Sequence, residues 1–302
     1  MSNIVVVGSL NMDLIISTPR MPQLGETLYG NGFRTVSGGK GSNQAYAAAR
    51  MGADVYMVGR VGEDAFGASL TQSLESVGAH TEYVFRTEDA PTGVAIITIC
   101  EGNNSIILDA GSNAKLTIQD MQRVESLLDK ADAVMLQLEI PMEVIQHIVR
   151  YCKGKTRIFL NPAPAQALDD ALLKGVDFLT PNEIEASQLS GIEVVDQKSA
   201  FAALDFFRSK GVFYPLITLG EKGVAYYDGK ENRLSSPRCV KAIDSTAAGD
   251  TFSGAFVHML CDGANMEEAI DFAQAAAAVA VTRKGAQSSI PSYDEVCAYM
   301  NA

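Results

Sequence analysis

One segment of the sequence combines carboxylates with small residues in a way that suits anion chemistry. It reads Asp244-Ser245-Thr246-Ala247-Ala248-Gly249-Asp250 and leads into an apolar stretch that predicts a helix over residues 251–261. The first turn of a helix has backbone N–H groups without partners, and these groups, aided by the helix dipole, favour a bound anion. Asp250 would lie beside them, where a carboxylate can take a proton from an alcohol that attacks phosphorus. Taken alone, the segment equally allows Asp250 to be only a helix cap.

A glycine-rich segment near residue 40 is the second candidate. It reads Gly38-Gly39-Lys40-Gly41-Ser42-Asn43 and precedes an alanine-rich stretch that predicts a helix over residues 44–51. It is not a Walker A loop, because no glycine stands five residues before Gly39 and no Ser or Thr directly follows Lys40. Alone, the string also fits a plain turn and helix start with a solvated Lys40.

Polar residues also stand where predicted strands end. Asn11 and Asp13 follow a β-branched run over residues 4–7, and Glu139 ends the run from 135 to 139. Ligands of open α/β sheets bind along the edge formed by the carboxyl ends of the strands. Two side chains two residues apart on an extended segment point the same way, so Asn11 and Asp13 can chelate neighbouring hydroxyls of a sugar. A turn-forming Asn and Asp, and an ordinary charge at a strand end, are the plainer readings.

A third element, Thr180-Pro181-Asn182-Glu183-Ile184-Glu185, opens another predicted helix. Asn182 and Glu185 lie three residues apart, on one face of the helix start. Magnesium is held by few carboxylates and keeps several waters, so a single Glu185 is enough to bind it through water. Helix capping by Asn182 is the alternative, and both can be true.

The surrounding elements predict an α/β fold. After residue 112 the predicted strands and helices alternate, which indicates a mostly parallel sheet covered on both faces, a three-layer sandwich. Two β-rich pieces, residues 12–37 and 92–111, do not fit this alternation, and the second contains a predicted hairpin turn at Gly102. We expect these pieces to form a small β-sheet lid over the carboxyl edge. The α/β catalytic domain would then comprise residues 1–11, 38–91 and 112–302.

Composition narrows the possible functions. The net charge of −12 argues against a nucleic-acid partner, although a small anion needs only a locally positive pocket. The sequence contains no uninterrupted apolar run long enough to span a membrane. The five cysteines are scattered, odd in number and without a CxxC pair, which is typical of reduced thiols in the cytoplasm. A dinucleotide-binding module is disfavoured, because no GxGxxG follows the first strand.

The segment ending at Asp250 resembles the second signature of the ribokinase family, also called the PfkB family of carbohydrate kinases. Gly38 to Asn43 resembles the first signature, and the resemblance runs from residue 4 to about 292. It implies the ribokinase-like fold, with Asp250 as catalytic base and the backbone of Ala247, Ala248 and Gly249 as anion hole. It also implies that the sugar is bound by Asn11, Asp13, Gly39, Lys40, Asn43, Glu139 and Asp250.

The resemblance further implies a nucleotide and two cations. ATP would be bordered by Asn182, Thr218, Gly220, Gly223, Gly249 and Gln274, and Mg²⁺ would be bound through water by Glu185. K⁺ would be bound by the Asp244 carboxylate, the Ser289 hydroxyl and the carbonyls of Thr246, Ala280, Arg283 and Gly285. Arg283 can equally be a helix C-terminal cap. Gln274 stands where His or Asn is common in the family, which leaves the nucleotide preference open.

The implied activity is ATP-dependent phosphorylation of D-ribose at the 5-hydroxyl, which gives ribose 5-phosphate and ADP. A kinase for another sugar or a nucleoside is the first alternative. A non-catalytic sugar-binding regulator is the second, although such a protein would be expected to lose its base or its anion hole. A homodimer through the lids is expected, because the exposed edges of a small sheet need pairing.

Overall fold

The structure is a computed structural model that describes residues 2–101 and 103–302, so the turn expected at Gly102 lies outside the described residues. Its centre is a nine-stranded sheet in the order β13-β12-β11-β10-β9-β8-β1-β4-β5. Neighbouring strands run parallel from β5 to β11, whereas β12 and β13 pair antiparallel. The strands are β1 (Asn3–Val7), β4 (Asp54–Gly62), β5 (His80–Thr87), β8 (Ala133–Leu136), β9 (Arg157–Leu160), β10 (Phe178–Leu179), β11 (Tyr214–Thr218), β12 (Val224–Tyr227) and β13 (Asn232–Leu234).

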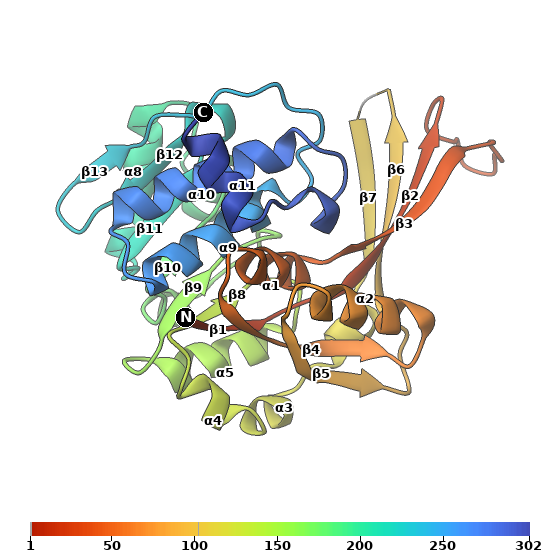
Figure 1. The fold of residues 1–302 in the computed structure, drawn as a ribbon, viewed down its shortest axis with the longest axis horizontal. Helices are drawn as coiled ribbons and strands as arrows, with labels where there is room; N and C mark the ends of the chain where they lie inside the picture. The colour runs from red at the N-terminus through yellow and green to blue at the C-terminus, as the bar shows by residue number, and fades with distance from the viewer. Residues whose placement is uncertain (1, 102) are drawn as a thin grey trace.

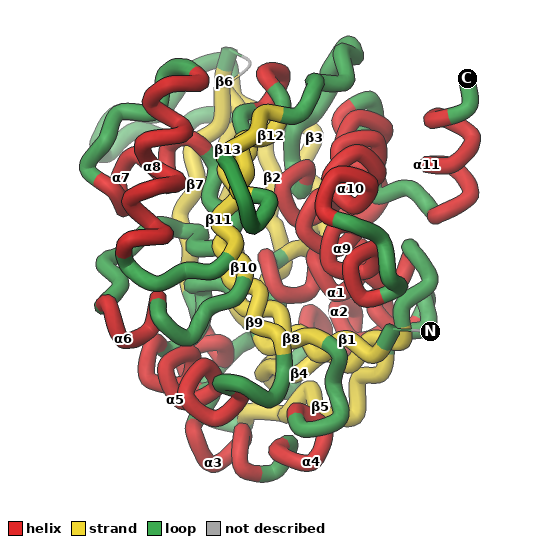
Figure 2. The backbone as a smooth tube through the Cα atoms, turned by 90° about the vertical axis from the view of Figure 1, so that its left-hand side faces the viewer, coloured by secondary structure: helices red, strands yellow, loops and turns green. Residues whose placement is uncertain are grey.

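Helices cover both faces of this sheet and give the predicted three layers (Figure 2). The α/β fold class with a separate small sheet is therefore confirmed. One face carries α1 (Lys40–Arg50), α2 (Ala65–Glu75), α9 (Ala248–Cys261), α10 (Met266–Val281) and α11 (Tyr293–Met300). The other face carries α3 (Ile118–Gln122), α4 (Glu125–Leu128), α5 (Met142–Cys152), α6 (Asp170–Leu173), α7 (Glu183–Ser190) and α8 (Gln197–Ser209). Three short 3₁₀ turns are η1 (Gly111–Lys115), η2 (Gly220–Lys222) and η3 (Gln287–Ser289).

Strand β1 shows why the sheet is buried on both faces. Its side chains alternate, so that Val5 and Val7 pack into the core under α5, while Ile4 and Val6 pack into the core under α1 and α9. All four side chains are fully buried. A continuous β-branched run is therefore what this central parallel strand requires.

A second sheet of four strands stands apart from the main sheet in the order β3-β2-β6-β7 (Figure 1). It consists of β2 (Asn11–Thr18), β3 (Asn31–Gly38), β6 (Gly93–Cys100) and β7 (Asn103–Asp109). The two pieces meet because β2 pairs with β6 in parallel. Every residue of β7 is exposed, so this sheet presents an open edge.

Several elements differ from the expectation: α6, α11 and β13 were not predicted, and two further differences have a local cause. The alternating pattern after residue 112 predicts a single helix over residues 118–130. The structure splits it into α3 and α4, because the chain leaves helical geometry at Val124 (φ −115°, ψ 7°). Strand β5 was not predicted, since it lies at the edge of the sheet and carries polar side chains on its exposed positions. Within the described residues, none of the helices has the length and apolar character needed to cross a membrane.

Candidate active site

Two helix starts and two strand ends meet at the carboxyl edge of the main sheet. The helix start at Lys40 packs closely on the segment that follows β1, because glycines remove the side chains between them. A Cβ on Gly41 would lie 2.5 Å from the backbone nitrogen of Ser9, and one on Gly39 would lie 2.6 Å from that of Asn11. Gly39 also has φ +93°, a conformation that residues with a side chain rarely adopt.

Asp250 lies in the first turn of α9 and is 8% exposed. Asn43 Nδ2 donates to its Oδ2 at 3.1 Å, and Gln44 Nε2 donates to its Oδ1 at 3.0 Å. No side-chain hydrogen bond caps α9 at its N-cap residue, Ala247. Asp250 is therefore not a helix cap, and its carboxylate is instead fixed by side chains of α1.

The backbone before Asp250 is strained in a way that suits an anion site. Ala247 has φ +59°, one of two non-glycine residues with positive φ in the described residues. The first turn of α9, which contains Asp250, begins directly after this residue, and N–H groups at such a position favour a bound anion. In the structure one of them, Ala248 N–H, donates to the Ser245 carbonyl at 3.2 Å.

Glu139 joins the strand ends to α1. Its Oε2 accepts from Ser9 Oγ at 2.5 Å, from the Lys40 backbone nitrogen at 3.2 Å and from Asn11 Nδ2 at 3.3 Å. Ser9 Oγ in turn accepts from Gly41 N–H at 3.2 Å. The predicted residues Asn11, Glu139 and Lys40 are thus in direct contact.

Asn113, on η1, holds the chain where it enters the small sheet. Its Oδ1 accepts from the Leu10 backbone nitrogen at 2.9 Å, and its Nδ2 donates to the Leu10 carbonyl at 3.1 Å. The same Nδ2 donates to Asn11 Oδ1 at 2.7 Å, which leaves the Asn11 Nδ2 facing Glu139. Asn113 is 1% exposed, so these contacts are shielded from water.

The charges around Asp250 are mostly negative. Burial raises the pKa of Asp13 to about 7, and repulsion from Glu139 and Asp250 adds to the rise. Burial acts to lower the pKa of Lys40, but the attraction of the surrounding carboxylates, Asp250 foremost, outweighs it and the pKa is raised. Lys40 is therefore held as a cation within a carboxylate cluster.

Asn182 and Glu185 form a capping box at the start of α7. Glu185 N–H donates to Asn182 Oδ1 at 2.8 Å, and Asn182 N–H donates to Glu185 Oε2 at 2.9 Å. Asn182 therefore caps the helix, as the alternative interpretation predicts. The second carboxylate oxygen, Glu185 Oε1, takes no part in the capping box. Burial raises the pKa of Glu185, so a nearby cation would stabilise its ionised form.

The predicted nucleotide loop follows β11. Thr218 bridges to Asn182, and the chain then passes through η2 with Gly220 at φ +57° and Gly223 at φ +96°. Gln274 does not project freely toward this loop. Its Oε1 accepts from Ser235 Oγ at 2.6 Å and its Nε2 donates to the Ser236 carbonyl at 3.0 Å, so its amide braces the segment beside Gly223.

The two loops predicted to bind potassium lie together. Asp244 Oδ2 accepts from Gly285 N–H at 3.0 Å, and Asp244 Oδ1 accepts from Thr246 N–H at 3.0 Å. Ser289 is fully buried, and its Oγ donates to the Ala286 carbonyl at 2.8 Å. The Arg283 side chain pairs with Glu295 on α11, at 2.7 Å.

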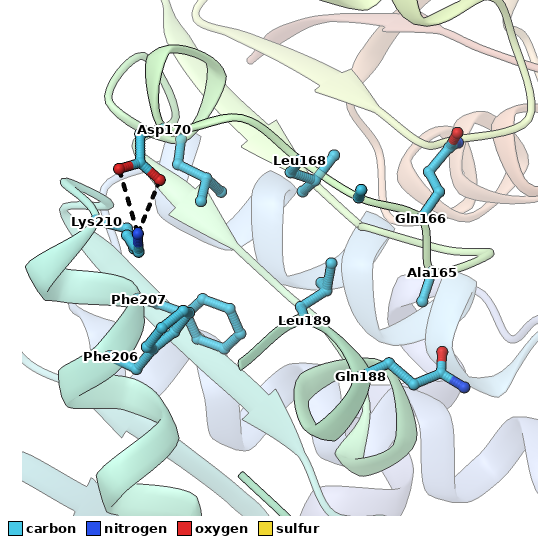
Figure 3. Close-up of a pocket in the computed structure, with 11 residues that line it drawn as sticks. Ala165, Gln166, Leu168, Asp170, Gln188, Leu189, Phe206, Phe207 and Lys210 are labelled. Carbon is cyan, nitrogen blue, oxygen red and sulfur yellow. Dashed lines mark hydrogen bonds and ion pairs between the residues drawn. The ribbon is translucent and has the colours of Figure 1, made fainter. Parts of the chain in front are cut away.

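Two cavities lie near these elements. One of about 420 Å³ is lined by Asn11, Asn113 and Glu139 together with lid residues around Asp109. The other, of about 460 Å³, lies among α6, α7 and α8, where Leu168, Leu189 and Phe206 face the Asp170–Lys210 ion pair (Figure 3). None of the predicted site residues lines the second cavity, so the first is the one that belongs to the site.

Several residues of this site were missed from the sequence. They are Ser9, Gln44, Asn113, Gln137 and Asn161, all of which contact predicted residues or one another. Gln137 carried a readable signal, because it is a polar residue between two leucines at a predicted strand end. Gln44 carried less, since it is the first residue of the helix predicted over residues 44–51. Asn113 carried none, since it follows a loop and makes its contacts only through the fold.

The comparisons with known proteins agree with this fold. The family model for pfkB family carbohydrate kinases matches residues 1–293. The chain belongs to this family of carbohydrate kinases. Its relatives include ribokinases: one from Haemophilus influenzae is 41% identical over 98% of each chain. A deoxyribokinase from Salmonella typhi is 37% identical over 99% of each chain. The structure of the Arabidopsis thaliana ribokinase complexed with ribose and ATP superposes with a TM-score of 0.93, at 33% identity over 100% of both chains.

Proposed function

We propose that this chain phosphorylates D-ribose at the 5-hydroxyl with ATP and releases ribose 5-phosphate and ADP. The single observation that carries the proposal is the placement of Asp250. It lies in the first turn of α9, held on both oxygens by side-chain amides and next to a cluster that contains Asn11, Asp13, Lys40 and Glu139. This arrangement supplies a base, donors for an anion and paired polar groups for a polyol at one point of the fold.

Asp250 accepts the proton of the 5-hydroxyl as that oxygen attacks the γ-phosphorus of ATP in line with the departing ADP oxygen. The first N–H groups of α9, at Ala247, Ala248 and Gly249, stabilise the charge that develops on the transferred phosphoryl group. Because Ala248 N–H donates to Ser245 in this structure, it must be shared or released when the phosphoryl group arrives. A positioned base of this kind contributes roughly 10²–10⁴-fold in rate.

Asn11, Asp13 and Asn43 are proposed to bind the sugar hydroxyls, with Gly39, Lys40 and Glu139 completing the site. Asn43 supports this assignment directly, since its Oδ1 is buried and lacks a hydrogen-bond partner among the described residues. A buried acceptor without a partner is costly, and a sugar hydroxyl would supply the missing donor.

Nucleotide binding is proposed for the segment between Thr218 and Gly223, with Asn182, Gly249 and the loop braced by Gln274. Glu185 is a fitting water-mediated ligand for Mg²⁺, because its Oε1 is outside the capping box and its half-buried carboxylate gains from a nearby cation. When bound, Mg²⁺ neutralises charge on the phosphates. The residues of this chain orient the nucleotide and exclude water around it.

A monovalent cation, K⁺, is proposed for the two loops joined by Asp244. The carboxylate of Asp244, the hydroxyl of Ser289 and the carbonyls of Thr246, Ala280, Arg283 and Gly285 offer oxygen atoms, which suit a hard cation. Two hydrogen bonds support this assignment, because the Asp244 carboxylate accepts from the N–H of Thr246 in its own loop and from the N–H of Gly285 in the other loop. The cation would stiffen the turn that presents the α9 N–H groups.

The small sheet is proposed to act as a lid, with residues 12–37 and 92–111 as one unit and residues 1–11, 38–91 and 112–302 as the catalytic unit. Its strands β2 and β3 carry the segments that end at Asn11 and Gly38, so movement of the sheet reaches the sugar site. Exposed apolar residues on it support a homodimer that pairs two lids: Phe33, Ile96, Ile106, Ile107 and Leu108.

A cytoplasmic location is proposed on the cysteines. All five are free thiols in the structure. Reduced, scattered cysteines of this kind are typical of cytoplasmic proteins.

The experiment on substrate identity is ADP release with a panel of pentoses, 2-deoxyribose, hexoses and nucleosides. Highest kcat/KM on ribose would support the proposal, and a clear preference for 2-deoxyribose or a nucleoside would overturn the choice of sugar.

A further inference from the structure

We propose that Gln44 and Gln137 are positioning residues that act in series on the catalytic base, with Gln137 orienting the amide of Gln44 and Gln44 orienting the carboxylate of Asp250. This inference rests on the proposed function of Asp250. It assigns a role to two buried glutamines that bind neither the sugar nor the nucleotide.

The three side chains form one continuous chain of contacts. Gln137 Nε2 donates to Gln44 Oε1 at 2.7 Å, and Gln44 Nε2 donates to Asp250 Oδ1 at 3.0 Å. Gln137 is fully buried and Gln44 is 1% exposed, so water does not compete for these groups. Three separate elements are joined in this way: the end of β8, the start of α1 and the start of α9.

The direction of the chain follows from its chemistry. A carboxylate can only accept, so the nitrogen of Gln44 must face Asp250 and its oxygen must face away. That oxygen then requires a donor, which the nitrogen of Gln137 supplies. Without Gln137, the Gln44 amide would be free to turn and present its oxygen to the carboxylate, a repulsive arrangement.

The oxygen of Gln137, at the end of the chain away from Asp250, indicates that the orientation of the two amides is fixed. Among the described residues, Gln137 Oε1 is buried without a hydrogen-bond partner. It lies against Gly8, where an added Cβ would come within 2.0 Å of it. A buried unpaired acceptor is unfavourable, and it is tolerated here because the opposite orientation would deprive Asp250 Oδ1 of its donor, Gln44 Nε2.

Gln44 also reaches the phosphate side of the site. Its Nε2 lies 3.3 Å from Asn161 Oδ1, and Asn161 Nδ2 donates to the Thr180 carbonyl at 2.8 Å. Thr180 stands two residues before Asn182, at the start of α7. The amide chain thereby sets the base relative to the segment proposed to contact the phosphates.

The charges that face Asp250 explain why it needs fixed donors. Asp13 on β2 and Glu185 on α7 repel a negative charge there, Glu139 after β8 adds to the negative field, and Lys40 on α1 attracts it. Hydrogen bonds to a carboxylate favour its ionised form. Loss of the Gln44 donor therefore removes one of the two side-chain hydrogen bonds that stabilise the carboxylate which must accept the proton of the sugar.

The test is the variant Gln137→Met, which preserves length and removes both hydrogen-bonding groups without touching Asp250. We expect kcat to fall about tenfold while KM for the sugar stays within about twofold. The acidic limb of the pH profile of kcat should move to higher pH. In a Gln44→Met background, Gln137→Met should cause no further loss of kcat, because the residue through which it acts is gone.

The matched control is Thr156→Val. Thr156 is 7% exposed, its Oγ1 donates to the Leu128 carbonyl at 2.9 Å, and it precedes β9 at the opposite edge of the sheet. This variant should lose stability without a change in kcat or pH profile. The proposal is overturned if Gln137→Met keeps the wild-type kcat and the wild-type pH profile. It is also overturned if the losses of kcat in the two single glutamine variants add up in the double variant. Should Gln137→Met not fold, Gln44→Met alone must show the shifted acidic limb, and an unshifted limb overturns the proposal.

The assay uses whichever sugar the wild-type protein phosphorylates fastest. A wild-type protein that phosphorylates no sugar contradicts the proposed function itself. An active wild-type protein with an unchanged Gln137→Met variant contradicts only the amide chain.

Discussion

The side-chain amide of Asn113 donates to Asn11 Oδ1 at 2.7 Å, and so joins the end of the lid to its beginning. Asn11 stands where the chain enters the lid, and Asn113 stands just after it returns. Because the Asn11 oxygen is occupied by Asn113, its nitrogen is directed to Glu139. The orientation of the Asn11 side chain, which is proposed to bind the sugar, is thus set by Asn113 at the base of the lid.

Replacing Asn113 should therefore weaken sugar binding more than it slows chemistry. For Asn113→Ala we expect KM for ribose to rise about tenfold and kcat to change by less than about threefold. Loss of the partners of the Leu10 backbone should also cost about 1–3 kcal/mol of unfolding free energy. Steady-state kinetics and thermal unfolding measure both effects. Asn103→Ala, at an exposed position of the lid, is the control, and a larger fall in kcat than rise in KM would contradict the account.

Asp13 makes the stability of the ligand-free protein depend on pH. Its pKa is raised from 3.8 to about 7, so between these values the folded protein binds a proton that the unfolded chain does not. Stability should fall as pH rises through this window, by about 1–4 kcal/mol at most. Asp13→Asn removes that loss, so its advantage in thermal unfolding over wild type should be larger at pH 8 than at pH 5. If Asp13→Asn is stabilised equally at pH 8 and pH 5, the raised pKa of Asp13 is not the cause of the pH dependence. The same conclusion follows if the exposed control Glu88→Gln also gains more stability at pH 8 than at pH 5.

The exposed residues of β7 should hold two chains together. Ile107 is 66% exposed, and a charge at its place would have to be buried in a paired interface. We expect Ile107→Glu to shift the protein from dimer to monomer in light scattering at micromolar concentration. Phe213→Glu changes a residue that is 61% exposed and lies on the catalytic unit, so it should leave the dimer intact. A wild-type monomer at that concentration contradicts pairing of the lids.

The loops joined by Asp244 should make activity depend on potassium. Replacing K⁺ by Li⁺ should lower kcat, because the smaller cation does not suit a site built from many carbonyl oxygens. Asp244→Asn should show a weaker response to K⁺ in initial-rate titrations, while exposed Asp262→Asn responds as the wild type does. Equal kcat values in K⁺ and Li⁺ would contradict the proposed potassium site.

The sequence predicts the fold and much of the site because their signals are local. The β-branched run of β1 and the glycines at Gly39 and Gly41 require specific local structure, and the residues at their ends meet at one sheet edge. The separation of the lid was predictable because its two pieces break the alternation of strands and helices. Edge strand β5 was not, since its mixed polar and apolar residues carry no clear period.

The amide contacts around Asp250 could not be predicted in the same way. Asn43 and Gln44 are adjacent in sequence, yet both reach the same carboxylate because Asp250 lies at the start of a helix that packs along α1. Gln137 joins them from the end of β8, more than ninety residues from Gln44. Such contacts depend on how distant elements pack, and the fold must be known before they can be seen.

The most direct test of the account is Asp250→Asn, measured by ADP release with ribose and by calorimetric titration of ribose. The variant keeps the size of the side chain but cannot accept the proton of the 5-hydroxyl. We predict that kcat falls by roughly 10²–10⁴-fold while ribose still binds within about tenfold of the wild-type affinity. A variant that retains kcat close to the wild-type value would contradict the assignment of Asp250 as the catalytic base.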